Sequence, residues 1–285
     1  MTIALDAGMQ AGVRTPRGGT TALADWLPRL IFAAYMVLFF AYLFLPLLVM
    51  TAATFNTSKF PTVTPWLGTT LGWFNALWAD QAMWQALRLS VFIGLCVIAI
   101  SLPVGTAAAL FLMSLQGKAR TFLYAVMVSP LLTPGVAIGI STLILWRQAG
   151  IGGGSFLIIL AQSSFISAYV MLMVAARLQR FDRTLEEAAV GLGASRLMVF
   201  RRILLPYLKL SLLAAMLIAF LQSFENYNTT LFVRGTETPL TVYIATKVRT
   251  GLTPAVNALG LILIALTIVA AVAMELAKRR RGQAR

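Results

Sequence analysis

Residues 184–206 read TLEEAAVGLGASRLMVFRRILLP, a polar, helix-prone stretch that joins two apolar segments of the chain. Thr184 followed three residues later by Glu187 is the pattern of a capping box, which predicts that a short helix begins here. Asp182 lies just upstream and can compete with Thr184 as the capping residue. Either residue would start a short polar helix at this point.

Two glycines interrupt this helix. Gly191 and Gly193 are expected to end it, because glycine adopts the backbone conformations that follow helix ends. Ser195 can cap a second helical segment, and Pro206 suits the first turn of the helix that comes next. The stretch therefore predicts a compact helix-turn-helix between the two apolar segments, and a rigid protrusion of this kind can transmit a push to both of them.

The composition identifies an integral membrane protein. The 285 residues are 59% hydrophobic and only 11% charged, with a mean hydropathy of +0.85, whereas soluble domains are about 45–50% apolar and about 25% charged. The net charge of +14 is divided among short clusters by uncharged runs, which favours membrane topology over nucleic-acid binding. With no histidine and a single cysteine, Cys96, the chain offers no internal disulfide and no His/Cys metal site.

The uncharged windows predict an all-α fold with six transmembrane helices, since about 20 apolar residues cross the hydrocarbon core. The windows are residues 30–58, 89–117, 121–146, 148–176, 210–224 and 250–274. The fifth is short and continues into the polar residues 225–230, so it spans only if that polar end is buried in protein. Prolines 46, 103, 130 and 134 fall within spans and predict kinks.

Lysine and arginine positions predict the orientation. Residues 177–209 and 278–285 carry the densest basic clusters, which places them, and both termini, on the cytoplasmic side. Residues 56–84 would then form an outer loop, whose tryptophans are typical of segments at the membrane interface. The apolar stretch after residue 25 is too long for a cleaved signal peptide. The expected organisation is a tail at 1–25, a first helix at 26–55, an outer loop at 56–84, a five-helix core at 85–277 with the loop 177–206, and a basic tail at 278–285.

A family resemblance rests on the helix-turn-helix. Glu187, Ala188 and Ala189, then Gly193 after three residues, and Ile203 to Pro206 after nine more, resemble without a gap the EAA signature of permease subunits in bacterial type I, binding-protein-dependent ABC importers. The resemblance implies that the first short helix docks in a groove of the ATPase subunit. It also implies that the residues that couple this chain to the ATPase are Glu187, Ala188, Ala189, Gly193, Ile203 and Pro206.

The resemblance also implies the partners. The chain contains no G-x-x-x-x-G-K-[ST] phosphate loop, so ATP and Mg²⁺ are expected in a partner ATPase and this chain is expected to be no enzyme and to hold no cofactor or metal. Two ATP-binding subunits, a periplasmic solute-binding protein and a second, non-identical permease would complete an alternating-access importer in the inner membrane. A secondary transporter or channel that works without ATP, and a purely structural membrane subunit, are the alternatives.

One acidic residue stands inside a membrane segment, and an intramembrane ionisable group predicts a functional site. Glu225 shares spacings of three, four and seven residues with Gln222, Asn226 and Thr229, which predicts a polar stripe on one helical face. That face would line the pathway or the subunit interface, unless Glu225 pairs with Arg234 or reaches the outer membrane interface. The expected pathway residues are Gln222, Phe224, Glu225, Asn226, Tyr227 and Thr229, with the two aromatic rings serving as a hydrophobic closure or as faces for a cation.

A second resemblance concerns the cargo. Residues 238–258 are similar to the corresponding segment in the second permease subunit of the spermidine/putrescine branch. The matching positions are Pro239, Leu240, Val242, Tyr243, Gly251, Leu252, Thr253, Pro254, Asn257 and Ala258. This resemblance implies a polyamine or a related small amine as cargo, while an opine, a phosphonate, thiamine or ferric iron remain alternatives.

Overall fold

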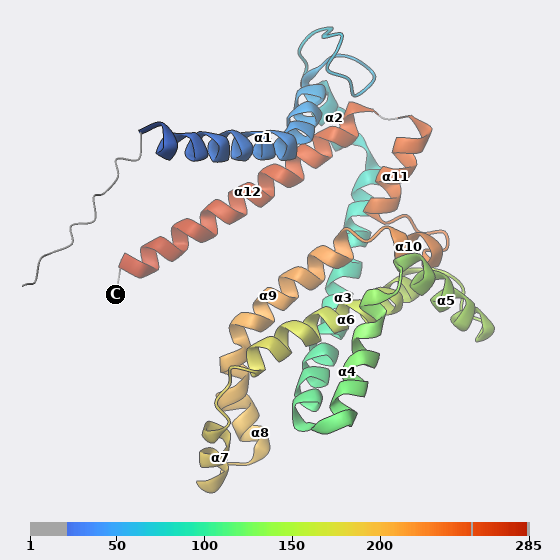
Figure 1. The fold of residues 1–285 in the computed structure, drawn as a ribbon. Helices are drawn as coiled ribbons and strands as arrows, with labels where there is room; N and C mark the ends of the chain where they lie inside the picture. Colours follow the sequence, from blue (N-terminus) through green and yellow to red (C-terminus); the bar gives the residue numbers. More distant parts are fainter. Residues whose placement is uncertain (1–21, 252, 284–285) are drawn as a thin grey trace, which may run out of the picture.

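A computed structural model describes residues 22–251 and 253–283, and within them the fold is all-α, as predicted, with one isolated β-bridge between Asn56 and Thr69. The helices are α1 Ala22–Phe55, α2 Gly72–Ala79, α3 Gln81–Ser114, α4 Gly117–Leu132, α5 Gly135–Gln148, α6 Ser155–Leu178, α7 Thr184–Gly191, α8 Arg196–Val199, α9 Leu205–Phe224, α10 Asn228–Val233, α11 Leu240–Thr250 and α12 Pro254–Gln283. Of the N-terminal tail expected at residues 1–25, residues 1–21 lie outside the described residues. Residues 22–25 form the beginning of α1 (Figure 1).

Four helices of the described residues are long and apolar enough to cross a membrane. They are Pro28–Phe55, Gln81–Ser114, Ser155–Leu178 and Arg196–Phe224. A fifth span is possible if α4 and α5 cross together, and α12 contributes a shorter apolar stretch, Pro254–Val269. The described residues therefore have the character of a membrane protein, whereas the count of six spans stays a prediction.

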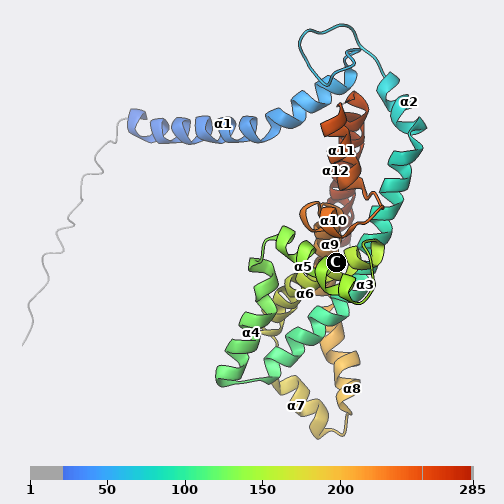
Figure 2. The same cartoon turned by 90° about the vertical axis from the view of Figure 1, so that its right-hand side faces the viewer.

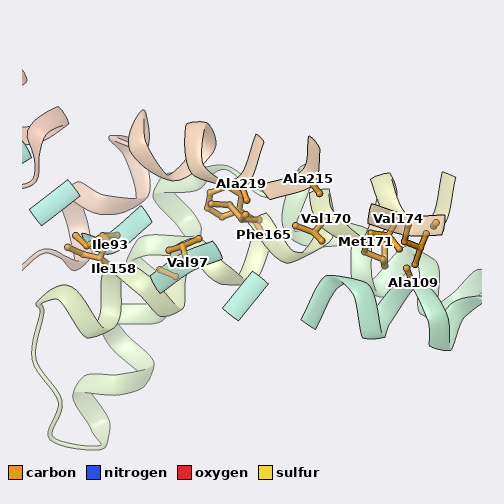
Figure 3. Close-up of a cluster of buried hydrophobic side chains, with 14 of the residues drawn as sticks. Ile93, Val97, Ala109, Ile158, Phe165, Val170, Met171, Val174, Ala215 and Ala219 are labelled. Atoms are coloured by element: carbon orange, nitrogen blue, oxygen red, sulfur yellow. The ribbon is translucent and has the colours of Figure 1, made fainter. Parts of the chain in front are cut away.

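The core is formed where α3, α6 and α9 pack together. Figure 3 shows part of this cluster, with Ile93 and Val97 from α3, Phe165 and Val170 from α6, and small alanines from α9. Gly105 explains why α3 and α6 come so close, since a Cβ atom there would lie 2.6 Å from the Ser167 carbonyl oxygen. Close van der Waals packing of these side chains holds the three helices together and provides the frame for the polar features below.

Helices α1 and α12 meet near residues 56–71 and diverge from α9 (Figure 1). Their contact is close at Gly260, where a Cβ atom would lie 3.2 Å from the Met50 sulfur. The described side chains of α1 from Trp26 to Val49 are almost all exposed. This apolar surface is suited to lipid or to another membrane subunit rather than to water.

The predicted third span is broken rather than straight. Helix α4 ends at Leu132 and α5 starts at Gly135, and the two axes are bent by 100°. Pro134 causes the break: it has no N–H to donate to Pro130, and it drives Thr133 into an extended conformation with φ −86° and ψ 130°. Kinks were predicted at Pro130 and Pro134 within the span over residues 121–146, and the structure shows a complete break at Pro134.

The predicted helix-turn-helix is present as α7 and α8, at the end of the molecule opposite residues 56–71 (Figures 1 and 2). Asp182 rather than Thr184 organises its start, because the Asp182 carboxylate accepts hydrogen bonds from the Thr184 amide at 2.9 Å and the Thr184 hydroxyl at 2.8 Å. These bonds hold the pKa of Asp182 below its ordinary value. The Thr184–Glu187 capping box is therefore absent, since the Thr184 hydroxyl is already engaged upstream.

The turn and the second helix follow the prediction more closely. Gly193 adopts a φ of +87°, the left-handed region that glycine tolerates best, and the Ser195 hydroxyl accepts a hydrogen bond from the Met198 amide at 3.3 Å. Pro206 lies in the first turn of α9, as predicted, but α9 is not separated from the hairpin. A π-helical turn, Phe200–Leu204, accommodates its missing N–H and makes Arg196–Phe224 continuous.

Residues 56–84 are more ordered than a simple interfacial loop. The buried Asn56 side chain donates to the carbonyls of Thr62 and Pro65 and accepts from the amides of Ser58 and Leu67. Helix α2 and the first turn of α3 then occupy the second half of this range. One asparagine therefore organises the first half of this loop.

Candidate functional site

The segment that carries Glu225 is a second helix break. Helix α9 ends at Phe224, where the Glu225 amide donates the last α-helical hydrogen bond to Leu221 at 3.0 Å, and α10 starts at Asn228. The predicted stripe along one continuous helical face was therefore wrong. Asn226 explains the break, since its side-chain oxygen accepts hydrogen bonds from the amide and the hydroxyl of Thr230 in place of a helical backbone bond.

The two breaks meet at one cavity of about 330 Å³. One wall comes from the α4–α5 break, another from the α9–α10 break, and α6 closes the side. The lining residues are Pro130, Leu131, Thr133, Gly135, Ile138, Phe165, Tyr169, Gln222, Glu225, Asn226, Tyr227, Asn228 and Thr229. Five of the six residues expected to line the pathway are thus brought together, although by two bent segments and not by one helix face.

Phe224 is the exception among the expected pathway residues. Its ring stacks on Phe220 with centroids 5.6 Å apart, and it packs against the cluster that contains Met83 and Leu240. It is not among the residues that line the cavity. Phe224 therefore supports the frame, whereas Tyr227 is among the residues that line the cavity.

Glu225 is exposed in the cavity and is the one acidic residue among its lining residues, which include no basic residue. The Gln222 side-chain amide donates to a Glu225 carboxylate oxygen at 3.3 Å. Arg234 instead donates to the Glu237 carbonyl, and the ion pair found in the described part of the chain joins Asp80 to Lys247. The alternative in which Glu225 is neutralised by Arg234 is therefore not realised in this structure.

A buried polar network behind the cavity was missed by the sequence analysis. Gln162 on α6 donates to the Thr230 hydroxyl at 2.8 Å and accepts from the Ser223 hydroxyl at 2.5 Å. All three side chains are at least 95% buried. The network holds the α9–α10 break against α6, and a glutamine within an apolar window was the available signal for it.

Glycines bring α5 unusually close to α10. A Cβ atom on Gly135 would lie 2.9 Å from the Thr229 hydroxyl, and one on Gly139 would lie 2.7 Å from the Thr229 carbonyl oxygen. The spacing of the two glycines is the G-x-x-x-G pattern that permits close helix packing in membranes. This contact ties the half-helices of the two breaks to each other.

The predicted coupling residues occupy two places. Glu187 and Ala188 are exposed on α7, Ala189 is half-buried, and Gly193 forms the turn. Ile203 and Pro206 instead lie at the root of the hairpin, in the π-helical turn and the first turn of α9. A groove of about 580 Å³ beside α7 is lined by Glu186, Glu187, Val190, Arg196, Val199, Phe200 and Leu204.

Two broken helices around a polar cavity, with a protruding hairpin opposite, characterise a membrane transport protein. Residues 101–283 match the family described as binding-protein-dependent transport system inner membrane component. The chain belongs to this family. It is a permease subunit of an ABC importer, as its relatives and structural neighbours also indicate.

The permease is 35% identical over 257 residues to the putrescine transport system permease protein PotI of Escherichia coli strain K12, covering 87% of this chain and 91% of PotI. It is 29% identical to the spermidine/putrescine transport system permease protein PotC of the same strain, over 88% of this chain and 95% of PotC. Among solved structures, a bacterial ABC transporter that imports alginate superposes with a TM-score of 0.68 at 16% identity, covering 88% of this permease and 97% of that chain. An amino acid ABC transporter superposes with a TM-score of 0.56 at 18% identity, and the superposition covers 74% of this permease and 100% of that chain.

Proposed function

We propose that this permease pairs with a second, non-identical permease subunit and forms half of a pathway for a polyamine across the bacterial inner membrane. A periplasmic solute-binding protein delivers the cargo, and two ATP-binding subunits, which hold ATP and Mg²⁺, drive alternating access. In this arrangement the α7–α8 hairpin and both termini are cytoplasmic, since residues 177–209 carry a dense cluster of arginines. Residues 56–84 then face the outside.

Coupling to the ATPase is supported by the surface of the hairpin. Leu185, Val190 and Leu192 are exposed on or next to α7, with Leu192 at 90% exposure. Apolar side chains this accessible on a polar protrusion mark a protein interaction site. Glu187 adds a charge for the partner, and the small side chains of Ala188 and Ala189 permit close approach.

The cargo assignment rests on one observation, which is the position of Glu225 at the meeting point of two helix ends. Helices α4 and α9 end at the cavity and α5 and α10 start there, so the partial negative charges of the two C-termini are opposed by the partial positive charges of the two N-termini. The carboxylate of Glu225 adds a full negative charge, and Tyr169 and Tyr227 offer aromatic faces. This combination favours an ammonium group, and the names of the relatives PotI and PotC make putrescine and spermidine the cargoes to test first.

The decisive experiment is uptake of labelled putrescine and spermidine by proteoliposomes that contain the full importer. Glu225→Gln retains the size of the side chain and removes its charge, so transport should fall at least tenfold while assembly and basal ATPase activity persist. Glu237→Gln is the matched control, since Glu237 is an acid outside the cavity lining. Wild-type rates in the Glu225→Gln variant would contradict the role of Glu225, and absence of amine uptake by the wild type would contradict the cargo class.

A further inference from the structure

Helix α11 lies beside the part of α3 that is nearest residues 56–71 (Figure 1). It is 11 residues long and is not among the candidate membrane spans. Two of its residues reach the residues that line the cavity. The Thr241 hydroxyl donates to the Asn226 carbonyl at 3.1 Å, and the Arg249 guanidinium donates to the Tyr227 hydroxyl at 3.4 Å.

The same helix is fastened to α3 and to its capping residue Asp80, at its start and again along its middle. At its start, the Leu240 amide donates to the buried Ser90 hydroxyl at 2.8 Å. Farther along, the Tyr243 hydroxyl donates a short hydrogen bond to the Asp80 carboxylate, and the Lys247 ammonium lies 3.7 Å from the same carboxylate oxygen. The Lys247 ammonium also lies over the Tyr243 ring, 5.3 Å from its centroid. The position of α11 is thus set by its attachment to α3.

The two oxygens of Asp80 have different partners. One accepts a hydrogen bond from the Met83 amide at 3.0 Å and thereby caps the N-terminus of α3. The other receives Tyr243 and Lys247. Partial burial on its own would raise the pKa of Asp80, but these hydrogen bonds and the ammonium outweigh it and hold that pKa below its ordinary value. Asp80 therefore remains an anion and joins α2, α3 and α11 at one point.

We propose that Asp80 is a positioning residue for the cargo cavity: by holding α11 against α3 through Tyr243 and Lys247, it sets the places of Asn226 and Tyr227. Asp80 lies outside the cavity and does not contact the cargo. The inference extends the proposed function to a residue that is far from Glu225 in sequence. It also links α2, which would face the solute-binding protein, to the groups that recognise the cargo.

Two variants separate this role from simple capping of α3. Asp80→Asn retains a side-chain oxygen for the Met83 amide but replaces the second oxygen with an NH₂ group, so the cap survives while the ion pair with Lys247 and the charged acceptor for the Tyr243 hydroxyl are lost. Tyr243→Phe removes only the phenolic hydroxyl. Thr246→Ala is the matched control, since the Thr246 hydroxyl lies on the same helix and bonds only within it, to the Val242 carbonyl.

The first measurement does not depend on the cargo. Amide hydrogen exchange of the assembled importer should accelerate in residues 225–231 and 240–250 in Asp80→Asn and Tyr243→Phe, and should stay at the wild-type rate in Thr246→Ala. Unchanged exchange in residues 225–231 in both variants would overturn the proposal. Because this readout needs no transport, it decides the positioning role even if putrescine is not a cargo and the proposed function fails.

The second measurement uses putrescine uptake by the same proteoliposomes at increasing concentrations of loaded binding protein. Displaced recognition groups should raise the half-saturating concentration by roughly tenfold at a nearly unchanged maximal rate, since a shift of about 1 Å can cost up to about 100-fold. Asp80→Glu, which keeps both the charge and the acceptors, should recover part of the loss. A lower maximal rate with an unchanged half-saturating concentration would overturn the proposal in favour of a purely structural role.

Discussion

The side-chain amide of Gln162 on α6 donates a 2.8 Å hydrogen bond to the hydroxyl of Thr230 on α10, inside the protein and next to the cavity that contains Glu225. The same amide accepts a hydrogen bond from Ser223, on the last turn of α9. One side chain therefore connects both sides of the α9–α10 break to a helix of the core. A buried network in which every member is paired stabilises one arrangement over others.

Replacement of Gln162 by leucine should destabilise the permease. The substitution leaves the Ser223 hydroxyl buried without an acceptor, at a cost of about 1–3 kcal/mol. The thermal unfolding midpoint of the purified protein should fall, whereas Ser164→Ala, which removes an exposed hydroxyl from the same helix, should leave it unchanged. An equal midpoint for Gln162→Leu and the wild type would show that the network contributes little.

Gly139→Ala should separate α5 from α10. The added methyl group would lie 2.7 Å from the Thr229 backbone oxygen, which cannot move as a flexible side chain can, so the expected cost is about 1–3 kcal/mol. Gly152→Ala provides the control, since a Cβ atom there meets nothing within 4 Å. The thermal unfolding midpoint and the rate of putrescine uptake should both fall in Gly139→Ala and should stay at wild-type values in Gly152→Ala. Similar behaviour of the two variants would contradict the close contact.

Gly193→Val should uncouple transport from ATP hydrolysis without preventing membrane insertion. A Cβ atom at Gly193 would meet no atom within 4 Å, so steric contact is not the reason for the expected effect. The reason is the backbone φ of +87°, a conformation that costs a residue with a side chain about 1–2 kcal/mol. Gly191→Ala, at a position with equally open space and no such backbone angle, should be tolerated. Copurification with the ATPase subunit and stimulated ATPase activity measure the effect. Normal values for Gly193→Val would refute the role of this turn in coupling.

The proposed orientation predicts a labelling pattern. After Cys96 is replaced by serine, a cysteine at Ser195 should be protected from a membrane-impermeant reagent in intact cells, and one at Leu71 should react. Both side chains are exposed in the structure, so access is controlled by the membrane and not by burial. Labelling of residue 195 before cell lysis would show that the hairpin lies outside the cell, which contradicts the proposed orientation.

The contribution of Asp80 to stability should be constant across the physiological pH range. Its pKa in the folded protein lies below the ordinary 3.8, so its stabilisation is complete above about pH 5 and is lost as the pH falls through the folded value. The pKa of Tyr243 is raised above its ordinary 10.0 by burial and by Asp80, so this hydroxyl keeps its proton until strongly alkaline pH. The difference in unfolding midpoint between the wild type and Asp80→Asn should therefore be flat between about pH 5 and 9 and shrink below about pH 4. A steep change near neutral pH would contradict the ion pair.

The hairpin could be predicted from sequence because its signals are local. The turn needs Gly193 for its positive φ, and Ser195 caps the following helix within three residues. The sequence offered both Asp182 and Thr184 as capping residues for the first helix and left the choice open. In the structure Asp182 is the cap, because its carboxylate accepts hydrogen bonds from both the amide and the hydroxyl of Thr184.

The cavity could be predicted only in part. The cluster of polar residues around Glu225 was visible, but its break was not, since no glycine or proline interrupts residues 222–229. Besides the local bonds of Asn226 to Thr230, the contacts that hold the break in place are long-range: Gln162 lies 61 residues from Ser223, and Gly139 meets a backbone oxygen of Thr229. A periodicity of 3.6 residues describes one helix and carries no information about such partners.

The π-helical turn at Phe200–Leu204 has a mechanical consequence. Because this turn lets the helix continue through Pro206, the helix from Arg196 to Phe224 is unbroken between the hairpin and the cavity. Its 29 residues form an arm roughly 44 Å long. If this arm tilts about its middle by about 10°, each end swings by roughly 4 Å in opposite directions. Leverage of this size would let a small displacement of α7 reopen a pocket at the far end of the same helix.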